Sequence, residues 1–267
     1  MSEALDAAAA IRRIILRQSH RANVGHIGSA LSVADVLATL YTRVLRISSP
    51  GDPERDRFIL SKGHAALALY AALAVKGWLA PAELDRFCGD GSLLGVHPDS
   101  TLPGVDLSTG SLGLGLSIGA GAALAARYQG SSRRVFVLLS DAECNEGSVW
   151  EAVMFAAHHR LGRLVALVDV NGQQGFGRTR DVLDLSPLSA RFAAFGWDVS
   201  DVDGHDPAAI EEAIAAGERR AAGPRVLILR TVFGRGVSFM EGQLRWHYLP
   251  MSEAEYRTAM AEVGGIS

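Results

Sequence analysis

Three carboxylates lie close together where an apolar segment of this chain gives way to a polar one. Asp141, Glu143 and Glu146 follow the run RRVFVLLS at 133–140, and Asn171 follows a second apolar run, RLVALVDV at 163–170. Carboxylate and amide oxygens with open coordination positions suit Mg²⁺ or Ca²⁺ bound together with a phosphate group. Asp and Asn are also ordinary turn and helix-cap residues, so spacing alone leaves both interpretations open.

Histidines form the second group with chemical potential. Four of the eight lie in glycine- or proline-flanked loop contexts, namely His26 (GHIG), His64 (KGH), His97 (VHP) and His247 (RWHY). Histidine transfers protons near neutral pH and can also donate to phosphate, which suits an active site. Of the other four, His158 and His159 lie on a predicted helix, and His205 is interpreted as a turn residue.

The elements that must position these residues alternate along the chain. Helices are expected over 4–19, 32–45 with Ser32 as N-cap, 113–127, 147–161, 187–195 and 207–220, and a further helix ends near Gly77. Strands are expected at FIL (58–60), 133–140, 163–170, 197–203 and 224–232, and residues 88–112 are expected to be loop. Strands that alternate with helices predict an α/β fold, a parallel sheet flanked by helices on both faces. With no repeat or linker in the sequence, one domain over 1–267 is the simplest division.

Composition excludes several classes of function. The chain has 267 residues, 48% of them hydrophobic and 21% charged, and its net charge of −3 favours neither nucleic acid nor a membrane surface. No apolar run is long enough to span a membrane and no secretory leader is recognisable. Cys88 and Cys144 are far apart, which disfavours a disulfide or zinc framework and favours a cytoplasmic location. Only Lys62 and Lys76 of the 26 basic residues are lysines, a bias interpreted as codon usage.

Several motifs in order resemble the N-terminal, diphosphate-binding domain of the transketolase family over nearly the whole chain. They are GHIGSALSVADVLATLY, DRFILSKGHAALALYA, HPDSTLPGVDLSTGSLGLG, LLSDAECNEG with LVALVDVNGQQ, and GVSFMEGQLRWHYLPMSEAEY. The resemblance implies the thiamine-diphosphate-binding fold, with thiamine diphosphate and Mg²⁺ (or Ca²⁺) as cofactors. It also implies transfer of a two-carbon ketol unit from a ketose to an aldose.

The resemblance assigns a role to each matching position. The metal ligands would be Asp141, Asn171 and the carbonyl of Gln173. The diphosphate would contact His64, His247 and the backbone at Ala142, and the cofactor rings would lie near Gly110 and Leu112. His26, His64, His97 and His247 would line the substrate channel and move protons. Glu146 would lie at a subunit interface near the cofactor, and Glu151 would be a second interface glutamate. Glu143 matches no role and is expected to be solvated.

Whole transketolases are more than twice this length, so a separate C-terminal subunit is expected to carry the pyrimidine-binding and C-terminal domains. A heterotetramer with two copies of each chain, acting on sugars or sugar phosphates, would follow. Four departures from the family pattern concern the cofactor and channel: Ser140–Asp141–Ala142 in place of GDG, Leu114 within LGLG, Ile27 within GHIG in place of GHPG, and Tyr248 where glycine is usual. Alanine resists positive φ, so cofactor binding could be weakened at Ala142.

Other interpretations fit the sequence less well. The α subunits of 2-oxo acid dehydrogenases share this domain but lack the histidine set, and deoxyxylulose-phosphate synthase matches DRFILSKGHAA poorly. A non-catalytic relative is supported only by the altered GDG. A nicotinamide dehydrogenase would rest on GSLGLGLSIGAG, whose glycine spacing is wrong and which no predicted strand precedes.

Overall fold

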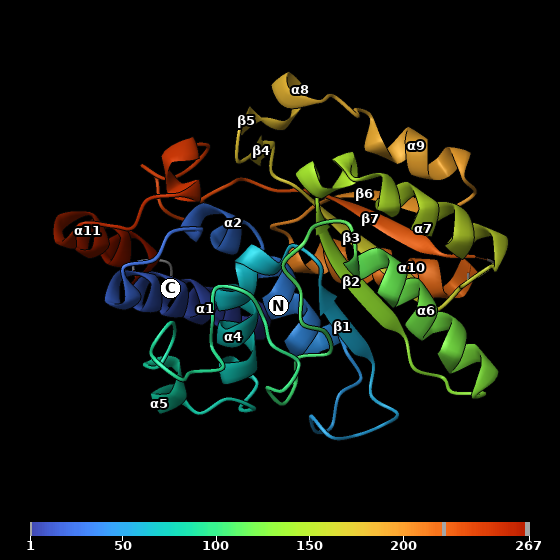
Figure 1. Ribbon diagram of the computed structural model, residues 1–267, viewed down its shortest axis with the longest axis horizontal. Helices are drawn as coiled ribbons and strands as arrows, with labels where there is room; N and C mark the ends of the chain where they lie inside the picture. Colours follow the sequence, from blue (N-terminus) through green and yellow to red (C-terminus); the bar gives the residue numbers. More distant parts are fainter. Residues whose placement is uncertain (1, 221–222, 265–267) are drawn as a thin grey trace.

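A five-stranded parallel sheet forms the centre of the molecule in the computed structural model, which describes residues 2–220 and 223–264 (Figure 1). The strands lie in the order β1-β2-β3-β7-β6 and every neighbouring pair is parallel. Their bounds are β1 Arg57–Leu60, β2 Val135–Ser140, β3 Leu164–Val170, β6 Asp198–Asp203 and β7 Arg225–Arg230. A short antiparallel pair, β4 Gln173–Gln174 and β5 Gly177–Arg178, follows β3.

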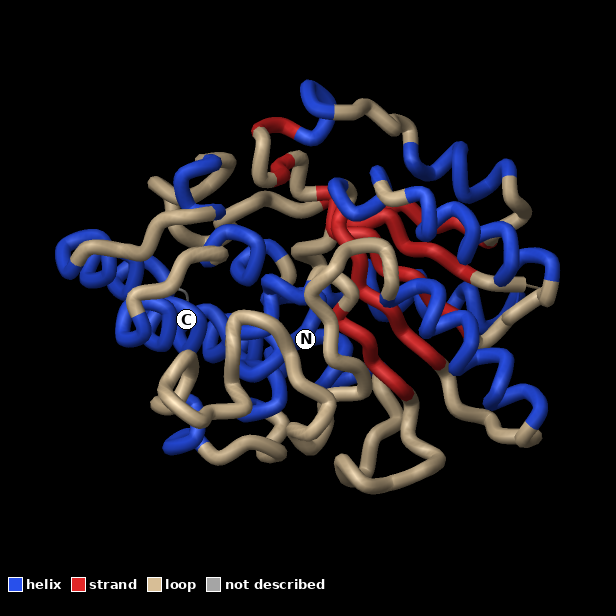
Figure 2. Tube along the Cα trace, viewed as in Figure 1, coloured by secondary structure: helices blue, strands red, loops and turns tan. Residues whose placement is uncertain are grey.

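Helices cover both faces of the sheet, as Figure 2 shows by the strands lying between two groups of helices. Successive residues of β2 point to opposite faces, so Phe136 and Leu138 join one buried cluster while Val135, Val137 and Leu139 join the other. The first cluster packs against α1 Ser2–Ala22, α2 Ile27–Ser32, α3 Ala34–Thr39, α4 Ala66–Val75, α10 Pro207–Arg220 and α11 Glu253–Gly264. The second packs against α6 Gly115–Tyr128, α7 Gly147–His158 and α9 Leu188–Ala194. The predicted fold class is therefore confirmed.

The region predicted as one helix over 32–45 is built differently. Two six-residue helices, α2 and α3, meet at Val33, and a π-helical turn, Leu40–Val44, follows α3. Ser32 is the last residue of α2 and caps nothing, so its prediction as an N-cap was wrong. Its hydroxyl instead donates to the carbonyl of Ser29 and to the carboxylate of Asp169. A serine beside an apolar run is typical of a helix cap. Here the serine hydroxyl instead donates to a buried carboxylate on a distant strand.

His205 lies in a turn as expected, but its side chain has a structural role that the sequence did not indicate. Its Nε2 accepts a hydrogen bond from the backbone N–H of Val232 at 2.8 Å, so Nδ1 carries the proton and donates to Asp35 at 2.7 Å. Arg12 binds the same carboxylate. This buried group fastens the segment after β7 to α3 and α1.

Further elements lay outside the predictions. The helix α5 Pro81–Leu84 interrupts a segment with weak periodicity, and α11 packs on α1 near the end of the described chain. Among the described residues no helix combines the length and hydrophobicity needed to cross a membrane. The division into one domain over 1–267 stays a prediction.

Candidate active site

A cavity of about 380 Å³ opens at the carboxyl ends of the strands, where ligands bind in open parallel sheets. Segments that follow β1, β2, β3 and β7 line it, together with the loop before α2 and the loop before α6. Ten of the eleven residues predicted from the sequence lie in its wall, namely His26, His64, His97, Gly110, Leu112, Ala142, Glu146, Asn171, Gln173 and His247. The eleventh, Asp141, is absent from this wall and lines a second cavity, described below. The structure thus brings the predicted residues together, and their individual roles stay a prediction.

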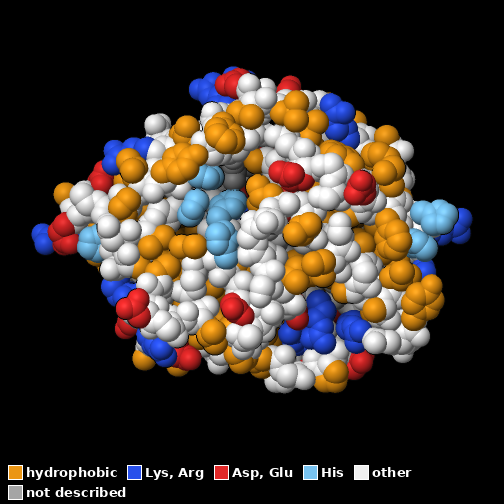
Figure 3. Space-filling model, viewed as in Figure 1, with side chains coloured by type: hydrophobic (Ala, Val, Ile, Leu, Met, Phe, Trp, Pro, Cys, Tyr) orange, Lys and Arg blue, Asp and Glu red, His pale blue; other side chains and the backbone are white. Residues whose placement is uncertain are grey.

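Three imidazole rings surround one corner of the cavity. The ring centroids of His26, His64 and His247 are 5.2 to 5.7 Å apart, and Figure 3 shows histidine side chains gathered around a hollow in the surface. Phe233, from the segment after β7, stacks on the ring of His247 with an interplanar angle of 11°. The hydroxyl of Ser29 lies 2.9 Å from Nε2 of His64. His97 lies on a different loop, next to Gly110.

His26 occupies its place through an unusual backbone conformation. Its φ of 60° places it in the left-handed region, which costs free energy for a residue other than glycine. Its backbone N–H donates to the carbonyl of His247 at 3.2 Å, and this bond holds the two rings on one side of the cavity. Strained residues of this kind concentrate at functional sites.

Burial keeps the clustered histidines neutral. The pKa of His64 is held well below its usual value by burial and then by the neighbouring Lys62 and histidines. Burial and His26 lower the pKa of His247 to about 4, and burial with His97 lowers the pKa of His26. Uncharged rings can each accept or donate a proton at pH 7, whereas imidazolium rings could only donate.

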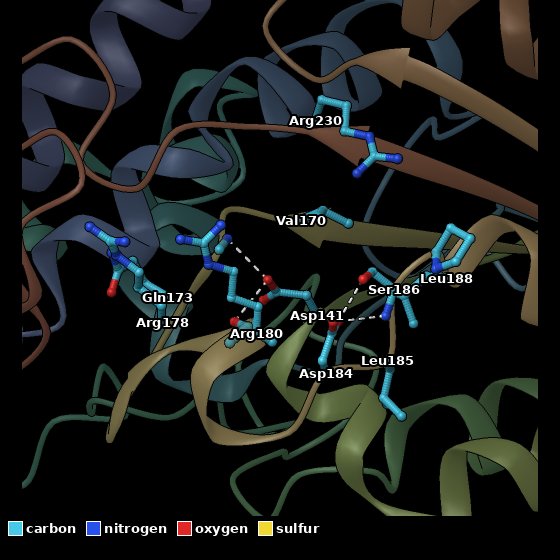
Figure 4. A pocket seen from close by; sticks show the side chains of 13 residues that line it. Asp141, Val170, Gln173, Arg178, Arg180, Asp184, Leu185, Ser186, Leu188 and Arg230 are labelled. Atoms are coloured by element: carbon cyan, nitrogen blue, oxygen red, sulfur yellow. Dashed lines mark hydrogen bonds between the residues drawn. The ribbon is translucent and has the colours of Figure 1, made fainter.

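Asp141 lines a second cavity of about 540 Å³, whose wall also includes Arg178, Arg180 and Arg230 (Figure 4), whereas its chain neighbours Ser140 and Ala142 line the histidine-lined cavity. Its Oδ1 accepts from the backbone of Ala142 at 2.9 Å, and its Oδ2 accepts from the backbone of Gly172 and the hydroxyl of Thr179, both at 3.0 Å. These bonds hold the carboxylate at the junction of two strand ends. Most of the predicted site residues face the histidine-lined cavity, which we therefore take as the candidate active site.

The charge balance around Asp141 favours a cation. Burial, and then the neighbouring Asp169, raise the pKa of Asp141 to about 6 despite three hydrogen bonds to its carboxylate. A divalent ion would relieve this penalty, so the position fits a metal ligand. In the described part of the chain, no three His, Cys, Asp or Glu side chains gather as a metal site. The predicted metal ligands are not a group of that type, because they comprise one carboxylate, one side-chain amide oxygen and one backbone carbonyl oxygen.

Asn171 and Gln173 supply the other two predicted oxygens. The side-chain Nδ2 of Asn171 donates to Asp169 at 2.6 Å, and its Oδ1 accepts from the backbone N–H of Gln173 at 3.0 Å. Both residues line the cavity from the turn that leads from β3 into β4. An amide oxygen and a backbone carbonyl beside a buried carboxylate are oxygen donors that Mg²⁺ accepts.

Glu143 was expected to be solvated, and this expectation was wrong. The residue is fully buried, and its carboxylate accepts hydrogen bonds from the Ser61 hydroxyl, from the backbone of Gly113 at 2.8 Å and from the backbone of Ser140 at 3.3 Å. Burial raises its pKa. Glu143 therefore fastens the ends of β1 and β2 to the loop before α6, below the cavity.

Glu146 lies on the rim, at the position before α7, and is exposed. Its side chain packs against Gly113, where a Cβ would lie 2.7 Å from the Cβ of Glu146. The φ of 84° at Gly113 also requires glycine. Glu151 is exposed one turn further along α7.

Two departures from the family pattern have a structural outcome. Ala142 begins a 3-10 turn and is absent from the residues with positive φ, so the strain expected there does not exist. Tyr248 is more than half exposed, and its hydroxyl donates to the carbonyl of Gly175. This bond links the segment around His247 to the turn between β4 and β5, across the edge of the cavity.

Sequence reasoning missed several residues of the cavity wall, including Ser29, Asn145, Gln174, Phe176 and Phe233. Phe233 follows the end of β7, which the sequence predicts as a strand. Its position after a strand end was therefore a usable signal. Four buried side-chain atoms of the wall have no hydrogen-bond partner: Nδ1 of His26, Nδ1 of His247, Oδ1 of Asn145 and Nε2 of Gln174. Buried polar atoms are rarely left unpaired, so these indicate a polar ligand.

Comparison with known proteins gives a consistent picture. The family model described as "Transketolase, thiamine diphosphate binding domain" matches residues 4–265. The 6-deoxy-6-sulfo-D-fructose transketolase subunit SqwG of Clostridium sp. is 41% identical, with 95% of this chain and 93% of that protein covered. One of the apulose-4-phosphate transketolase subunits of Phocaeicola vulgatus is 37% identical, covering 94% of this chain and 90% of that protein.

Solved structures agree with these sequence relatives. The transketolase of Campylobacter jejuni superposes with a TM-score of 0.92 at 26% identity, and a transketolase of Pichia stipitis with 0.91 at 30%. Each match covers 99% of this chain but only 43% and 41% of those chains, so this chain spans about two fifths of the length of the solved transketolases.

Proposed function

Because the chain belongs to the transketolase family, in which it corresponds to the thiamine diphosphate-binding domain, we propose that its histidine-lined cavity binds that cofactor together with Mg²⁺. The family and the predicted class of enzyme, a transketolase subunit, are confirmed by relatives of similar length that bear this name. The observation that carries the finer proposal is the convergence of ten predicted residues on one cavity whose wall has four unpartnered polar atoms.

The residues that would hold the cofactor come from the ends of three strands and from the 3-10 turn Leu244–His247. Asp141, Asn171 and the carbonyl of Gln173 would hold Mg²⁺, whose charge offsets that of the diphosphate. The N–H groups at the start of the 3-10 turn Ala142–Asn145 and the rings of His64 and His247 would contact the diphosphate. When bound, thiamine diphosphate supplies the carbon nucleophile and the electron sink for ketol transfer.

The chain's own contribution to the chemistry lies in its imidazoles. His26 and His247 both line the cavity, so their rings would exchange protons with sugar hydroxyls there. The neutral state of both rings allows exchange in either direction at neutral pH. His97, on the exposed side of the cavity, would contact the part of the sugar farther from the cofactor.

Exposed apolar side chains support a second, partner chain. Leu114 just before α6 and Ile118 on α6, with Met154 and Phe155 on α7, are each between 41% and 50% exposed, and α6 packs beside α7. Hydrophobic side chains are visible over this region in Figure 3. Apolar patches of this kind mark protein interfaces. We infer that a separate C-terminal subunit covers this surface near Glu146, in a heterotetramer with two copies of each chain.

The substrates would be sugars or sugar phosphates, transferred as two-carbon ketol units. Tyr248 and the 88% exposed Phe176 stand at the edge of the cavity. They would favour a donor or acceptor different from the common pentose phosphates. A panel of ketose donors with wild type and Tyr248→Gly tests this, and an ordinary pentose-phosphate preference in the wild type would contradict it.

A cytoplasmic location, without nucleic acid or membrane as partner, fits the two unpaired cysteines, of which Cys88 is exposed and Cys144 buried. Localisation of a tagged chain by fractionation tests it.

The function is tested with Asp141→Ala in the two-subunit complex. We expect ketol transfer from a ketose donor to fall by at least a hundredfold while the complex elutes at the same size. Glu212→Ala, a change at an exposed residue of α10 away from the cavity, is the matched control and should retain activity. Full activity in Asp141→Ala would favour a binding subunit without a catalytic metal site.

A further inference from the structure

A buried ion pair lies beneath the cavity and belongs to none of the roles described so far. The side chains of Lys62 and Asp169 are both fully buried, and Nζ of Lys62 lies 2.5 Å from Oδ2 of Asp169. Lys62 follows β1 and Asp169 lies near the end of β3, so β2 separates the two strands that carry them. The pair therefore joins the outer strand β1 to the central strand β3 at the end of the sheet on which the site is built.

Asp169 collects hydrogen-bond donors from four separate segments of the chain. Besides Lys62, it accepts from the hydroxyl of Ser32 at 2.9 Å, from Nδ2 of Asn171 at 2.6 Å and from the hydroxyl of Thr231. These donors come from the ends of β1, α2, β3 and β7. A carboxylate saturated in this way fixes the relative positions of all four segments.

Two of these bonds determine how groups of the cavity are oriented. Because Asp169 holds Nδ2 of Asn171, the amide oxygen Oδ1 is the atom that can serve as a metal ligand; it accepts one hydrogen bond, from the backbone N–H of Gln173, and keeps a second lone pair. On the other side, Nζ of Lys62 donates to the carbonyl of Ser29 at 3.1 Å, and the hydroxyl of Ser29 contacts Nε2 of His64. One ion pair thus reaches both the predicted metal ligand and a predicted diphosphate contact.

The residue type at position 62 is informative in a chain that otherwise uses arginine. Only two of its 26 basic residues are lysines, and Lys62 is the one that is fully buried. A compact ammonium with three donors can serve Asp169 and the Ser29 carbonyl at once, whereas the larger planar guanidinium needs more room. A buried ion pair is also a weak source of stability compared with apolar packing, which favours an organising role.

We propose that Lys62 and Asp169 are positioning residues that orient Asn171 and the Ser29–His64 pair for binding of metal and diphosphate. The proposal rests on the proposed function for the identity of the ligand. The competing explanation is that the pair is purely structural. It would then stabilise the fold, and breaking it would affect the cavity no more than breaking any other buried ion pair.

Asp169→Asn tests the proposal against Asp56→Asn as a matched control. Asp56 is also fully buried and bound to arginines, Arg134 and Arg46, but it lies at the amino end of β1, opposite the cavity. The assay is calorimetric titration of the two-subunit complex with thiamine diphosphate in the presence of Mg²⁺. Changing an outer partner of a metal ligand typically costs 10- to 100-fold in affinity, so we expect at least a tenfold loss in Asp169→Asn and less than a twofold change in Asp56→Asn. Equal losses in both variants, or a loss below threefold in Asp169→Asn, would overturn the proposal.

A milder pair of variants covers the case in which Asp169→Asn does not fold. Thr231→Val removes one hydroxyl from Asp169 with little change of shape, and we expect it to weaken binding about three- to tenfold. Thr231→Ser keeps the hydroxyl and should bind within twofold of wild type. If Thr231→Val binds as tightly as wild type, the proposal is wrong. If the wild-type complex itself binds no thiamine diphosphate, the proposed function fails instead.

Discussion

Replacing Asp141 by asparagine should make the ligand-free chain more stable while removing its affinity for a metal. In the folded chain, burial and Asp169 raise the pKa of this carboxyl from 3.8 to about 6. An increase of this size makes the ionised form unfavourable by roughly 3 kcal/mol at neutral pH, since each pKa unit is worth about 1.36 kcal/mol. A buried charge kept at such a cost is expected where a ligand of opposite charge binds.

The variant does not recover all of this free energy. The carboxylate accepts three hydrogen bonds, from Ala142, Gly172 and Thr179, and an amide turns its NH₂ group toward some of these donors. At about 1 kcal/mol for each lost bond, one or two losses leave a net stabilisation of about 1–2 kcal/mol at pH 8. The sign follows from the raised pKa: the penalty is complete above the folded pKa of about 6 and disappears as pH falls toward 3.8.

Urea unfolding of wild type and Asp141→Asn, without metal or cofactor, measures this difference at pH 8 and pH 5. We expect the variant to be more stable at pH 8 and its advantage to shrink by about 1 kcal/mol at pH 5. Added Mg²⁺ and thiamine diphosphate should stabilise the wild type and not the variant. A variant that is less stable than wild type by more than 1 kcal/mol at pH 8 would refute the reasoning, and so would a difference independent of pH.

Three further predictions follow from the same geometry. His247 has a pKa lowered to about 4 by burial, so the free energy of unfolding should fall as pH decreases from 6.5 toward 4; urea unfolding should show a weaker dependence in His247→Phe. Glu143→Ala leaves the buried N–H groups of Gly113 and Ser140 without an acceptor and should cost about 2–4 kcal/mol of stability, whereas a loss below 1 kcal/mol would contradict the assigned contacts. Ala142→Gly should give no gain in cofactor affinity by calorimetry, because Ala142 has no positive φ to relieve; a clear gain would show that this position limits binding.

The sequence could predict the parts of the site that lie at strand ends. Apolar runs followed by Asp141 and Asn171 indicated two neighbouring strands whose carboxyl ends meet, and the pairing of Ser140 with Asp169 places them in register. The loop histidines were recognisable from their glycine-rich surroundings. Their convergence depended on the order of motifs along the chain and not on any single spacing.

The buried polar contacts beneath the site could not be predicted. The polar neighbours of Glu143 in the sequence predict a solvated side chain. Its carboxylate instead accepts hydrogen bonds from Ser61, 82 residues away, and from Gly113, 30 residues away. Nothing near Lys62 in the sequence distinguishes it from an ordinary basic residue, because its partner Asp169 lies 107 residues further along the chain. Burial of a charged group is decided by partners from distant elements, and local sequence patterns carry no information about them. Ser32 failed as a predicted cap for the same reason.

This chain would contribute half of an active site and would work only with thiamine diphosphate and a second subunit. The most direct measurement is ketol transfer from a ketose donor to an aldose acceptor, assayed with this chain alone, with only the C-terminal subunit, and with both, each with and without the cofactor and Mg²⁺. Turnover only in the complete mixture is the predicted result. Full turnover by this chain without its partner, or by the complex after the cofactor has been removed, would contradict the account.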